Sequence, residues 1–412
     1  MKKDWEIKKL EETVEFQRGL TYSKKDEIDF SENIVLRSNN IDLLKNELDF
    51  TELKYINPAI EVPENKKVKK GSLLICTANG SKSHLGKVAL IDDDYNYAFG
   101  GFMGQITPKQ NLNSKFLFYL MTSDKYKKFI NELSDGANIN NLKFSDLGQF
   151  EIPLPPLPEQ QRIVSILDEA FAAIAKAKAN AERNLKNAKE LFESYLQGVF
   201  ERRGVGWEER KVKDIGFAQT GTTPKTAEKE NYGDFIPFIK PADVDFSGIG
   251  DIRYDNEGLS EIGLKKGRKM ESGSILMVCI GATIGKAGFA EREVSCNQQI
   301  NSLTVKKEFE AKFIYYAMTS RGFQDKVLLE GKGAQATLPI INKSKWENLT
   351  IAFPKSKTEQ KVFVEKLDAL SIESQKLQEI YLKKIADLGE LKKSILQKAF
   401  SGELETEKIF VQ

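Results

Sequence analysis

Cysteine and histidine are scarce in this chain of 412 residues, which has three cysteines and one histidine. The cysteines at 76, 279 and 296 lie far apart, so the closely spaced pairs that hold structural zinc are absent. Isolated thiols suit a reducing compartment, and we expect a cytoplasmic protein. The single histidine, His84, excludes sites that need two imidazoles. We expect neither a metal nor another cofactor on this chain.

Long apolar runs and an excess of one charge are also missing. The longest apolar run, Ile275–Ile280, is too short to span a bilayer, and the first ten residues lack the apolar core of a signal peptide. We expect no membrane association. The net charge is +2, from 62 basic against 60 acidic residues, so any surface that binds nucleic acid must be local. The length exceeds that of one hydrophobic core and indicates two or more domains.

Catalytic motifs are missing as well. The chain has no phosphate-binding Walker loop. A DNA methyltransferase would need an Asn/Asp-Pro-Pro-aromatic motif, but the prolines between 153 and 158 are flanked by leucine. The glycine-rich run Phe99–Gly104 is more typical of a turn beside a strand than of a cofactor site. We therefore expect a protein that is not an enzyme.

A long segment occurs twice. Residues 159–200 and 359–400 align without a gap at an offset of 200, so that Gln160 matches Gln360 and Asp168 matches Asp368. In both copies apolar residues recur in steps of four and three, which is the seam of a coiled coil. At roughly 1.5 Å per residue, 42 helical residues span about 63 Å. The seam residues that we predict are Ile163, Leu167, Ile174, Leu191, Phe363, Leu367, Leu377, Leu388, Leu391 and Ile395.

One amphipathic helix of this kind would be typical of an ordinary core helix. Two copies in the same register favour pairing with each other. Both copies have a polar residue at one seam position, Asn184 and Lys384. Our hypothesis is that this polar break fixes the register of the helices.

The repeat extends beyond the helices. Trp5 matches Trp207 at an offset of 202, Gly86 matches Gly285 at 199 and Gly136 matches Gly333 at 197. Because the offset drifts only here, we expect these regions to differ in their loops. Apolar runs at 71–77 and 273–280 predict buried strands, residues 114–133 and 311–329 predict helices, and 150–154 and 349–353 predict strands that lead into the long helices.

The fold class that we predict is α+β, with a pseudo-two-fold internal repeat. Two tandem mixed α/β, strand-rich domains are each followed by a long helix, and the helices pair as an antiparallel coiled coil. We expect the first domain at residues 1–153 and the first long helix at 154–203. The second domain is expected at 204–353, and the second long helix with a C-terminal tail at 354–412.

Polar residues at equivalent places suggest recognition of DNA. Arg37–Ile41 lies where the second half has Lys240–Val244, and arginine and asparagine pair bidentately with base edges. The loops 136–141 and 331–337 are rich in amides and hydroxyls, and a hydrogen-bonded turn is the alternative to base contact there. The candidate DNA-contacting residues are Arg37, Ser38, Asn39, Asn40, Lys82, His84, Asn138, Asn140, Thr222, Thr223, Lys225, Lys240, Lys286, Gln335 and Thr337.

A basic run precedes the glycine-led strand in each half. Phosphate contact is one interpretation, and a solvated loop is the other. The candidate phosphate contacts are Lys66, Lys67, Lys69, Lys70, Lys265, Lys266, Arg268 and Lys269.

The order of these motifs resembles that of the specificity subunit of a type I restriction–modification enzyme. The resemblance rests on the tandem halves, the Gly-Ser-Leu/Ile-Leu strands, Thr220–Pro224, the Pro-Pro-Leu-Pro-Glu-Gln-Gln-Arg-Ile entry to the first helix, and Gln397–Leu404. Ser356–Gln360 departs from the proline-rich entry, and Arg18–Thr21 departs from the Thr-Gly-Thr-Thr-Pro pattern. These departures affect the expected loop conformations.

The resemblance implies two target recognition domains that each read one part of a bipartite sequence in double-stranded DNA. It implies that the paired helices set the spacer and dock two methyltransferase subunits, which restriction subunits (translocase and nuclease) join. S-adenosylmethionine and ATP would bind to those partners. Two alternatives remain: a coiled-coil scaffold whose repeated domains bind protein or carbohydrate, and a fused methyltransferase, which the missing motifs disfavour.

Overall fold

The computed structural model describes residues 5–135, 141–244, 252–332 and 338–404. The chain divides into two units, residues 1–180 with 384–412 and residues 181–383. Each unit contains one domain and a part of each of two long helices. Among the described residues no helix is both long and apolar enough to cross a membrane.

In its described residues the first domain, from β1 to β10, has two four-stranded sheets and a two-stranded ribbon. One sheet has the antiparallel order β2-β9-β6-β7, and the other has the order β3-β5-β4-β8, in which β4 and β8 are parallel. The strands are β1 (Glu6–Lys9), β2 (Val14–Arg18), β3 (Glu27–Ile28), β4 (Ile34–Leu36), β5 (Lys54–Ile56), β6 (Leu73–Cys76), β7 (Val88–Leu90), β8 (Ala98–Phe99), β9 (Met103–Pro108) and β10 (Glu151–Leu154).

The second domain, from β11 to β20, repeats the ribbon and the antiparallel sheet of the first domain, whereas its other sheet has a different strand order. Its sheets have the orders β12-β19-β16-β17 and β14-β13-β18-β15, and β13 and β18 form the parallel pair. The strands are β11 (Trp207–Lys211), β12 (Gly216–Thr220), β13 (Tyr232–Ile239), β14 (Gly258–Leu259), β15 (Lys269–Met270), β16 (Ile275–Val278), β17 (Ala287–Phe289), β18 (Val294–Cys296), β19 (Ile300–Val305) and β20 (Thr350–Pro354). The internal repeat predicted from the sequence is therefore a repeat of fold.

The central strands β6 and β16 explain the apolar runs that predicted them. Successive side chains of a strand point to opposite faces. Leu73 and Ile75 pack into the core beneath the helices, whereas Leu74 and Cys76 pack into a second core with strands of the other sheet. In the second domain Ile275 and Leu276 divide in the same way. Both faces are buried, and the sequence is therefore continuously apolar.

Short helices cover one face of the antiparallel sheet in each domain. The helix predicted at 114–133 is two helices, α2 (Ser114–Leu120) and α3 (Asp124–Asp135), and that at 311–329 is α8 (Ala311–Thr319) and α9 (Arg321–Gly331). The break has one cause in both halves: a buried serine, Ser123 or Ser320, bonds the carbonyl three residues earlier. The other short helices in the described residues are α1 (Leu10–Thr13), α4 (Phe144–Leu147), α6 (Val212–Ile215), α7 (Glu261–Lys266) and α10 (Lys343–Glu347).

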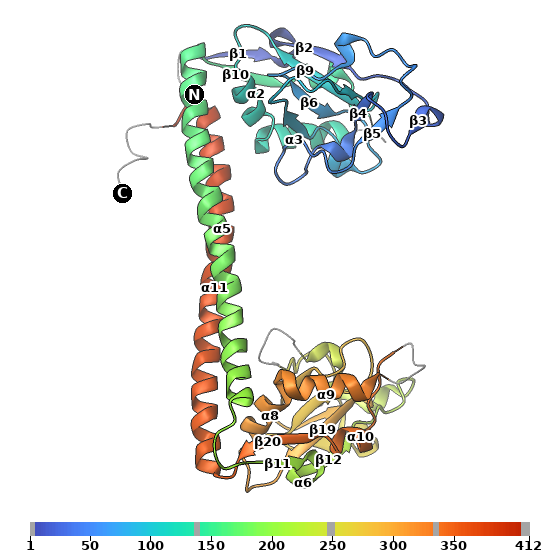
Figure 1. Cartoon of the computed structure of the whole chain (residues 1–412), viewed down its shortest axis with the longest axis vertical. Coiled ribbons are helices and arrows are strands. Elements are labelled where there is room, and N and C mark those ends of the chain that lie inside the picture. Colours follow the sequence, from blue (N-terminus) through green and yellow to red (C-terminus); the bar gives the residue numbers. More distant parts are fainter. Residues whose placement is uncertain (1–4, 136–140, 245–251, 333–337, 405–412) are drawn as a thin grey trace. The chain divides into compact units, whose positions relative to one another are not determined.

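The two long helices are α5 (Leu157–Glu201) and α11 (Lys357–Ser401), each of 45 residues. They run antiparallel and lie side by side (Figure 1, green and orange-red), as the sequence predicts. In the first unit the beginning of α5 shares a core with the end of α11 and with the first domain. Ser356 caps α11, since its Oγ accepts a hydrogen bond from the N–H of Glu359 at 3.4 Å.

The predicted seam agrees with the burial of most of its residues and is wrong at Leu191 and Leu391, which lie in the C-terminal part of each helix. Ile163 and Leu167 are buried, but Leu191 and Leu391 are 48% and 47% exposed. In α5 the buried positions after Ala188 are instead Phe192, Leu196 and Val199. A straight helix has 3.6 residues per turn and drifts from a seam of period 3.5. The ends of both helices also pack on a domain, which turns the buried face.

The polar-break hypothesis requires a buried polar residue at the seam of each helix. This is wrong for α11, because Lys384 is exposed, whereas Asn184 of α5 is half-buried.

The other predicted seam residues are Ile174, which is buried, and Phe363, Leu367, Leu377, Leu388 and Ile395, which are buried or half-buried.

Candidate nucleic-acid interface

A capped turn follows the first strand of the parallel pair in each domain, β4 or β13. We name these two segments, residues 37–41 and 240–244, the capped turns. In the first, Asn40 Oδ1 accepts a hydrogen bond from the N–H of Arg37 at 2.8 Å. In the second, Asp243 Oδ2 accepts one from the N–H of Lys240 at 2.8 Å. The two segments aligned by sequence therefore have the same local structure, although their side chains differ.

A lysine that immediately precedes a strand, Lys87 before β7 or Lys286 before β17, contacts each capped turn. Lys87 is 9% exposed, and its Nζ donates to the carbonyl oxygen of Ile41 at 2.7 Å. Lys286 Nζ lies 3.4 Å from the equivalent carbonyl oxygen of Val244. Burial lowers the pKa of the Lys87 ammonium. Lys286, a candidate DNA contact, thus also supports the second capped turn. Lys87, the equivalent residue of the first domain, was not among the predicted site residues. The signal that could have found Lys87 is the repeated Gly-Lys pair.

The side chains of the first capped turn have different roles. Asn40 is 1% exposed, and its amide donates to the carbonyl oxygens of Asp49 and Glu52, both at 2.8 Å. Its hydrogen-bonding groups are therefore used within the domain. Arg37 and Ser38 are half-buried and Asn39 is exposed. Of the predicted base contacts in this turn, Arg37, Ser38 and Asn39 therefore remain the better candidates, because their side chains are not fully buried.

A second loop of the first domain meets this turn at the end of β6. Asn79 donates from Nδ2 to Ser38 Oγ at 2.8 Å, a contact that the sequence did not indicate. Lys82 and His84 follow on a short 3-10 helix, with Lys82 exposed and His84 half-buried. Burial, with the nearby Lys87 charge, lowers the pKa of His84. The candidates Asn138 and Asn140 lie outside the described residues.

The second domain brings a different set of side chains to the equivalent place. The N–H of Thr222 bonds the carbonyl oxygen of Cys296 at 2.9 Å, next to the second capped turn. Thr223 Oγ1 bonds Gln298 Oε1, which the sequence did not indicate, and Lys240 Nζ pairs with Glu257. Lys225 is exposed and 3.5 Å from Glu228. The candidates Gln335 and Thr337 lie outside the described residues.

The basic runs differ in structure between the halves. The first lies between a 3-10 helix at Glu64–Lys66 and β6, whereas the second spans the end of α7 and β15. Several of these cations already have partners. The pairs are Lys67 with Glu64 at 2.5 Å, Lys70 with Asp93 at 3.5 Å, Lys265 with Glu261 at 3.6 Å, Lys266 with Glu228 at 2.9 Å and Lys269 with Glu293 at 2.8 Å. Lys66 Nζ and Arg268 Nη1 donate to carbonyl oxygens, and Lys69 is exposed. Exposed pairs of this kind exchange partners at little cost.

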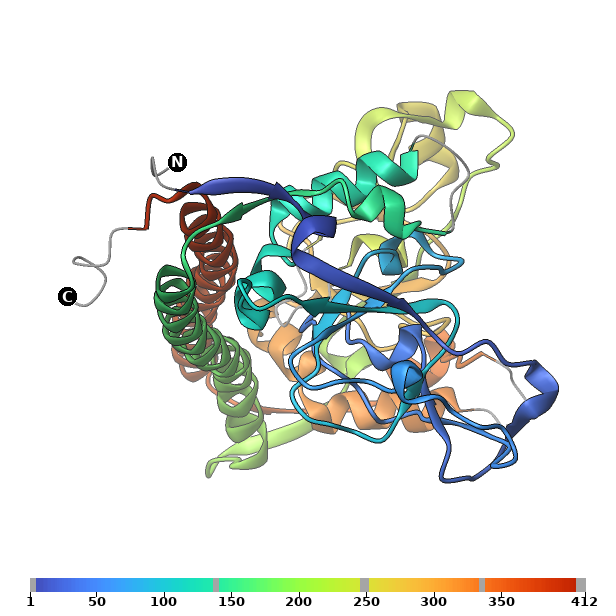
Figure 2. The same ribbon diagram turned by 90° about the horizontal axis from the view of Figure 1, so that it is seen from above.

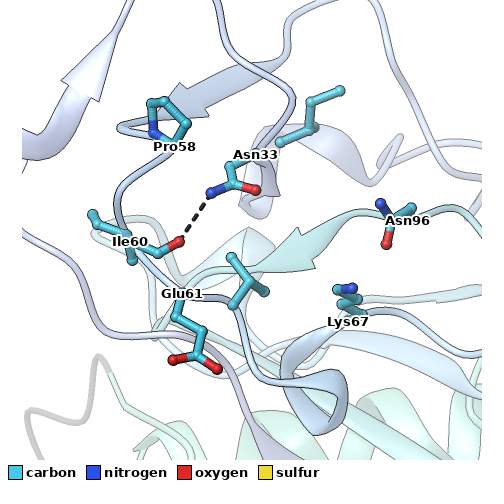
Figure 3. Close-up of a pocket in the computed structure, with 8 residues that line it drawn as sticks. Asn33, Pro58, Ile60, Glu61, Lys67 and Asn96 are labelled. Atoms are coloured by element: carbon cyan, nitrogen blue, oxygen red, sulfur yellow. Dashed lines mark hydrogen bonds between the residues drawn. The ribbon is translucent and has the colours of Figure 1, made fainter.

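A small pocket of about 210 Å³ lies in the first domain beside the parallel strand β4. Figure 3 shows Asn33, Glu61, Lys67 and Asn96 around it, with the Asn33 amide bonded to the carbonyl oxygen of Ile60 at 3.0 Å. The pocket therefore joins one predicted phosphate contact, Lys67, to two asparagines that the sequence did not single out.

A larger groove of about 710 Å³ lies in the first unit, between α3 and the end of α11. Phe171 and Lys392 line it, and Lys392 Nζ lies 4.9 Å from the ring centroid of Phe171. The residue that matches Lys392 on the other helix is Phe192, which is 3% exposed and packs into the core of the second domain. The groove thus marks a difference between two otherwise equivalent places.

Among the described residues no group of three or more histidine, cysteine, aspartate or glutamate side chains could hold a metal ion.

Comparison with known proteins supplies the family. The model of the type I restriction modification DNA specificity domain matches residues 2–183 and again 204–382. The StySPI specificity subunit of Salmonella potsdam is 25% identical over 410 residues, which cover 94% of this chain and 86% of that protein. The EcoKI specificity subunit of Escherichia coli K12 is 32% identical over 198 residues, 47% of this chain and 42% of that protein.

Solved structures share the fold. A chain from a structure on complex assembly and conformational transition of the type I R-M system has a TM-score of 0.76 at 20% identity, covering 98% of this chain and 99% of that one. The HsdS subunit from Thermoanaerobacter tengcongensis has a TM-score of 0.65 at 18% identity, covering 98% of both chains. The resemblance seen in the sequence is confirmed, and this chain belongs to the family of type I restriction modification DNA specificity proteins.

Proposed function

We propose that this chain is the non-catalytic specificity subunit of a type I restriction–modification complex and binds double-stranded DNA. One observation carries the proposal. The DNA specificity family model matches the chain twice, and in both matched regions the antiparallel sheet, β2-β9-β6-β7 or β12-β19-β16-β17, has the same strand order. Each domain then reads one half of a bipartite target through its capped turn and the loops beside it.

The two half-sites differ in sequence, because the capped turns carry different side chains. The first presents Arg37 and Asn39, whereas the second has Lys240 followed by proline and alanine. Arginine and lysine both contact guanine edges, but the bidentate contact of asparagine to adenine cannot be reproduced by the proline and alanine that follow Lys240. An asymmetric target follows from this difference.

The helices set the spacer and dock two methyltransferase subunits, which restriction subunits join. S-adenosylmethionine and ATP bind to those partners in the cytoplasm. The specificity subunit contributes recognition and geometry. Its capped turns place side chains against base edges, while basic residues neutralise DNA phosphates and fix the orientation of the complex.

The experiment is to express this chain with its methyltransferase subunits and to map methylated bases by sequencing. The expected result is one bipartite motif with a fixed spacer. Replacing residues 1–153 with those of another family member should change one half-site only. A change in both half-sites would contradict separate reading by the two domains.

A gel shift with random duplex DNA across salt concentrations distinguishes the proposal from a coiled-coil scaffold. Phosphate contacts release counterions, so affinity should fall steeply as salt rises. Absence of salt-dependent binding by the assembled complex would favour the scaffold.

A further inference from the structure

Each domain is fixed to the long helix that follows it by the same four side chains. In the first unit Asp168 of α5 accepts two hydrogen bonds from α2, one from the Tyr119 hydroxyl at 2.5 Å and one from Lys115 Nζ at 2.7 Å. In the second unit Asp368 of α11 accepts them from the Tyr316 hydroxyl at 2.5 Å and Lys312 Nζ at 2.7 Å.

A buried glutamine near the start of each helix forms the second attachment. Gln160 is completely buried, accepts a hydrogen bond from the N–H of Asn113 at 2.8 Å and donates to the carbonyl oxygen of Pro155 at 2.7 Å. Gln360 is also completely buried. It accepts a hydrogen bond from the N–H of Glu310 and donates to the carbonyl oxygen of Pro354, both at 2.8 Å. We name these four residues in each half the domain–helix joint.

Two attachments fix an angle that one attachment leaves free. Gln160 and Asp168 are eight positions apart on α5, which is about 12 Å along the helix axis. The apolar core shared by domain and helix is non-directional and resists separation more than rotation. The hydrogen bonds to the aspartate are directional and charge-assisted, so they oppose tilting about the glutamine.

The joint recurs although much around it differs. The offset between the halves is 197 at the tyrosines, where the domains differ in their loops, and 200 at the aspartates on the helices. The same hydrogen bonds with the same distances nonetheless form in both units. The hydrophobic cores of the two units differ in composition. Each unit is thus stabilised by different apolar contacts, and stability alone does not require the same hydrogen bonds in both.

We propose that Asp168 and Asp368 are positioning residues that determine how strictly the spacer between the two half-sites is measured. This inference rests on the proposed function. Adding one base pair to the spacer moves a half-site by about 3.4 Å and turns it by about 35° around the DNA axis. A domain that is held at two points cannot follow that change, whereas a domain that tilts about the glutamine accepts it.

The test compares methylation of targets with the native spacer and with one base pair more or fewer, using the chain assembled with its methyltransferase subunits. Wild type should methylate only the native spacing. Asp168→Ala and Asp368→Ala should each reduce the preference for native spacing about fivefold or more, the worth of one directional hydrogen bond. The half-site sequences should stay unchanged.

The matched control is Tyr95→Phe against Tyr119→Phe. Tyr95 donates its hydroxyl to Asp92 at 2.8 Å within the first domain, so the chemical change is the same but does not affect the joint. Only Tyr119→Phe should relax the spacing. Asp168→Asn keeps an acceptor for the Tyr119 hydroxyl. Compared with Asp168→Ala, it should therefore restore most of the preference for the native spacing. Lys115→Met serves as a milder variant should the alanine variants fail to fold.

The outcomes separate the two proposals. A wild-type complex with no sequence-specific methylation would overturn the proposed function. A specific wild-type complex whose joint variants lose activity equally at every spacer length would overturn the positioning role, because loss of folded protein does not change the ratio between spacers.

Discussion

Ser374 Oγ donates a hydrogen bond of 2.7 Å to the main-chain oxygen of Ala188, which belongs to the other long helix. The two residues are 2% and 4% exposed, so the helices approach closely at small side chains. This contact joins α11 to α5 in the second unit and is a better candidate for fixing the helix register than the polar break, because Lys384 is exposed.

Enlarging this position should separate the helices. Ser374→Leu inserts a bulky side chain where a serine is almost fully buried, and the free energy of unfolding should fall by about 1–3 kcal/mol. Ser374→Ala removes only the hydrogen bond and should cost about 1 kcal/mol. Urea denaturation followed by circular dichroism measures both. A leucine variant as stable as wild type would show that the interface is loosely packed.

Matched lengthening of the helices should lengthen the spacer. Seven residues inserted after Asn180 and seven after Lys383 preserve the coiled-coil register and add about 10 Å, close to three base pairs of DNA. Methylation mapping should show both half-sites unchanged and a longer spacer. The control is the insertion after Asn180 alone, which should impair helix pairing. An unchanged spacer in the matched variant would contradict a measuring role for the helices.

Arg37 should contribute to the choice of base in one half-site. Arg37→Ala should cost about 1–3 kcal/mol of binding and relax the preference at one position of that half-site. Lys69→Ala, at an exposed predicted phosphate contact, should instead weaken binding to all sequences and reduce the salt slope by about one. Competition binding of the assembled complex with single-base variants of its target distinguishes the two. Equal losses on every sequence for Arg37→Ala would assign it to phosphate.

The cysteines should make stability fall at high pH. Burial raises the pKa of Cys76 to about 11 and that of Cys279 and Cys296 to about 12, from an ordinary value of 9.0. Because the folded-state pKa values lie above the unfolded ones, this stabilisation is complete below pH 9 and is lost as the pH rises toward 11–12.

Urea midpoints measured between pH 8 and pH 11 check the direction of this effect, and Cys76→Ala should reduce it. At pH 8 a thiol-reactive disulfide reagent should modify all three cysteines in urea and none in the native protein. Rapid modification without urea would contradict the burial of the thiols.

Much of the fold could be predicted because it depends on periodicity. Apolar steps of four and three gave the long helices, and the glycine-led apolar runs gave β6 and β16. The seam prediction at Leu191 and Leu391 was wrong because the sequence does not reveal where a helix stops facing its partner and starts facing a domain. That change depends on tertiary packing.

The candidate site was less predictable. Aligning the halves placed the two capped turns correctly, since both retain a side chain that caps its own turn, Asn40 or Asp243. The hydrogen bonds from Lys87 to Ile41 and from Asn79 to Ser38 were not predicted, because they join residues 46 and 41 positions apart in the sequence. The joint residues Gln160 and Asp168 were visible as repeated letters, but the partners of Asp168 on α2, Lys115 and Tyr119, were not.

The ribbons that open and close each domain bear on how the protein evolves. Glu6 of β1 pairs with Leu154 of β10, and Trp207 of β11 pairs with Pro354 of β20 (Figure 2 shows β1 in dark blue beside β10 in green). The chain thus enters and leaves each domain at one place. Recombination of the gene at the two codons that flank a ribbon would exchange a whole domain and leave the helices intact. New DNA specificities could therefore arise in a single genetic event, provided that the incoming domain brings the lysine and tyrosine that meet the aspartate of the helix.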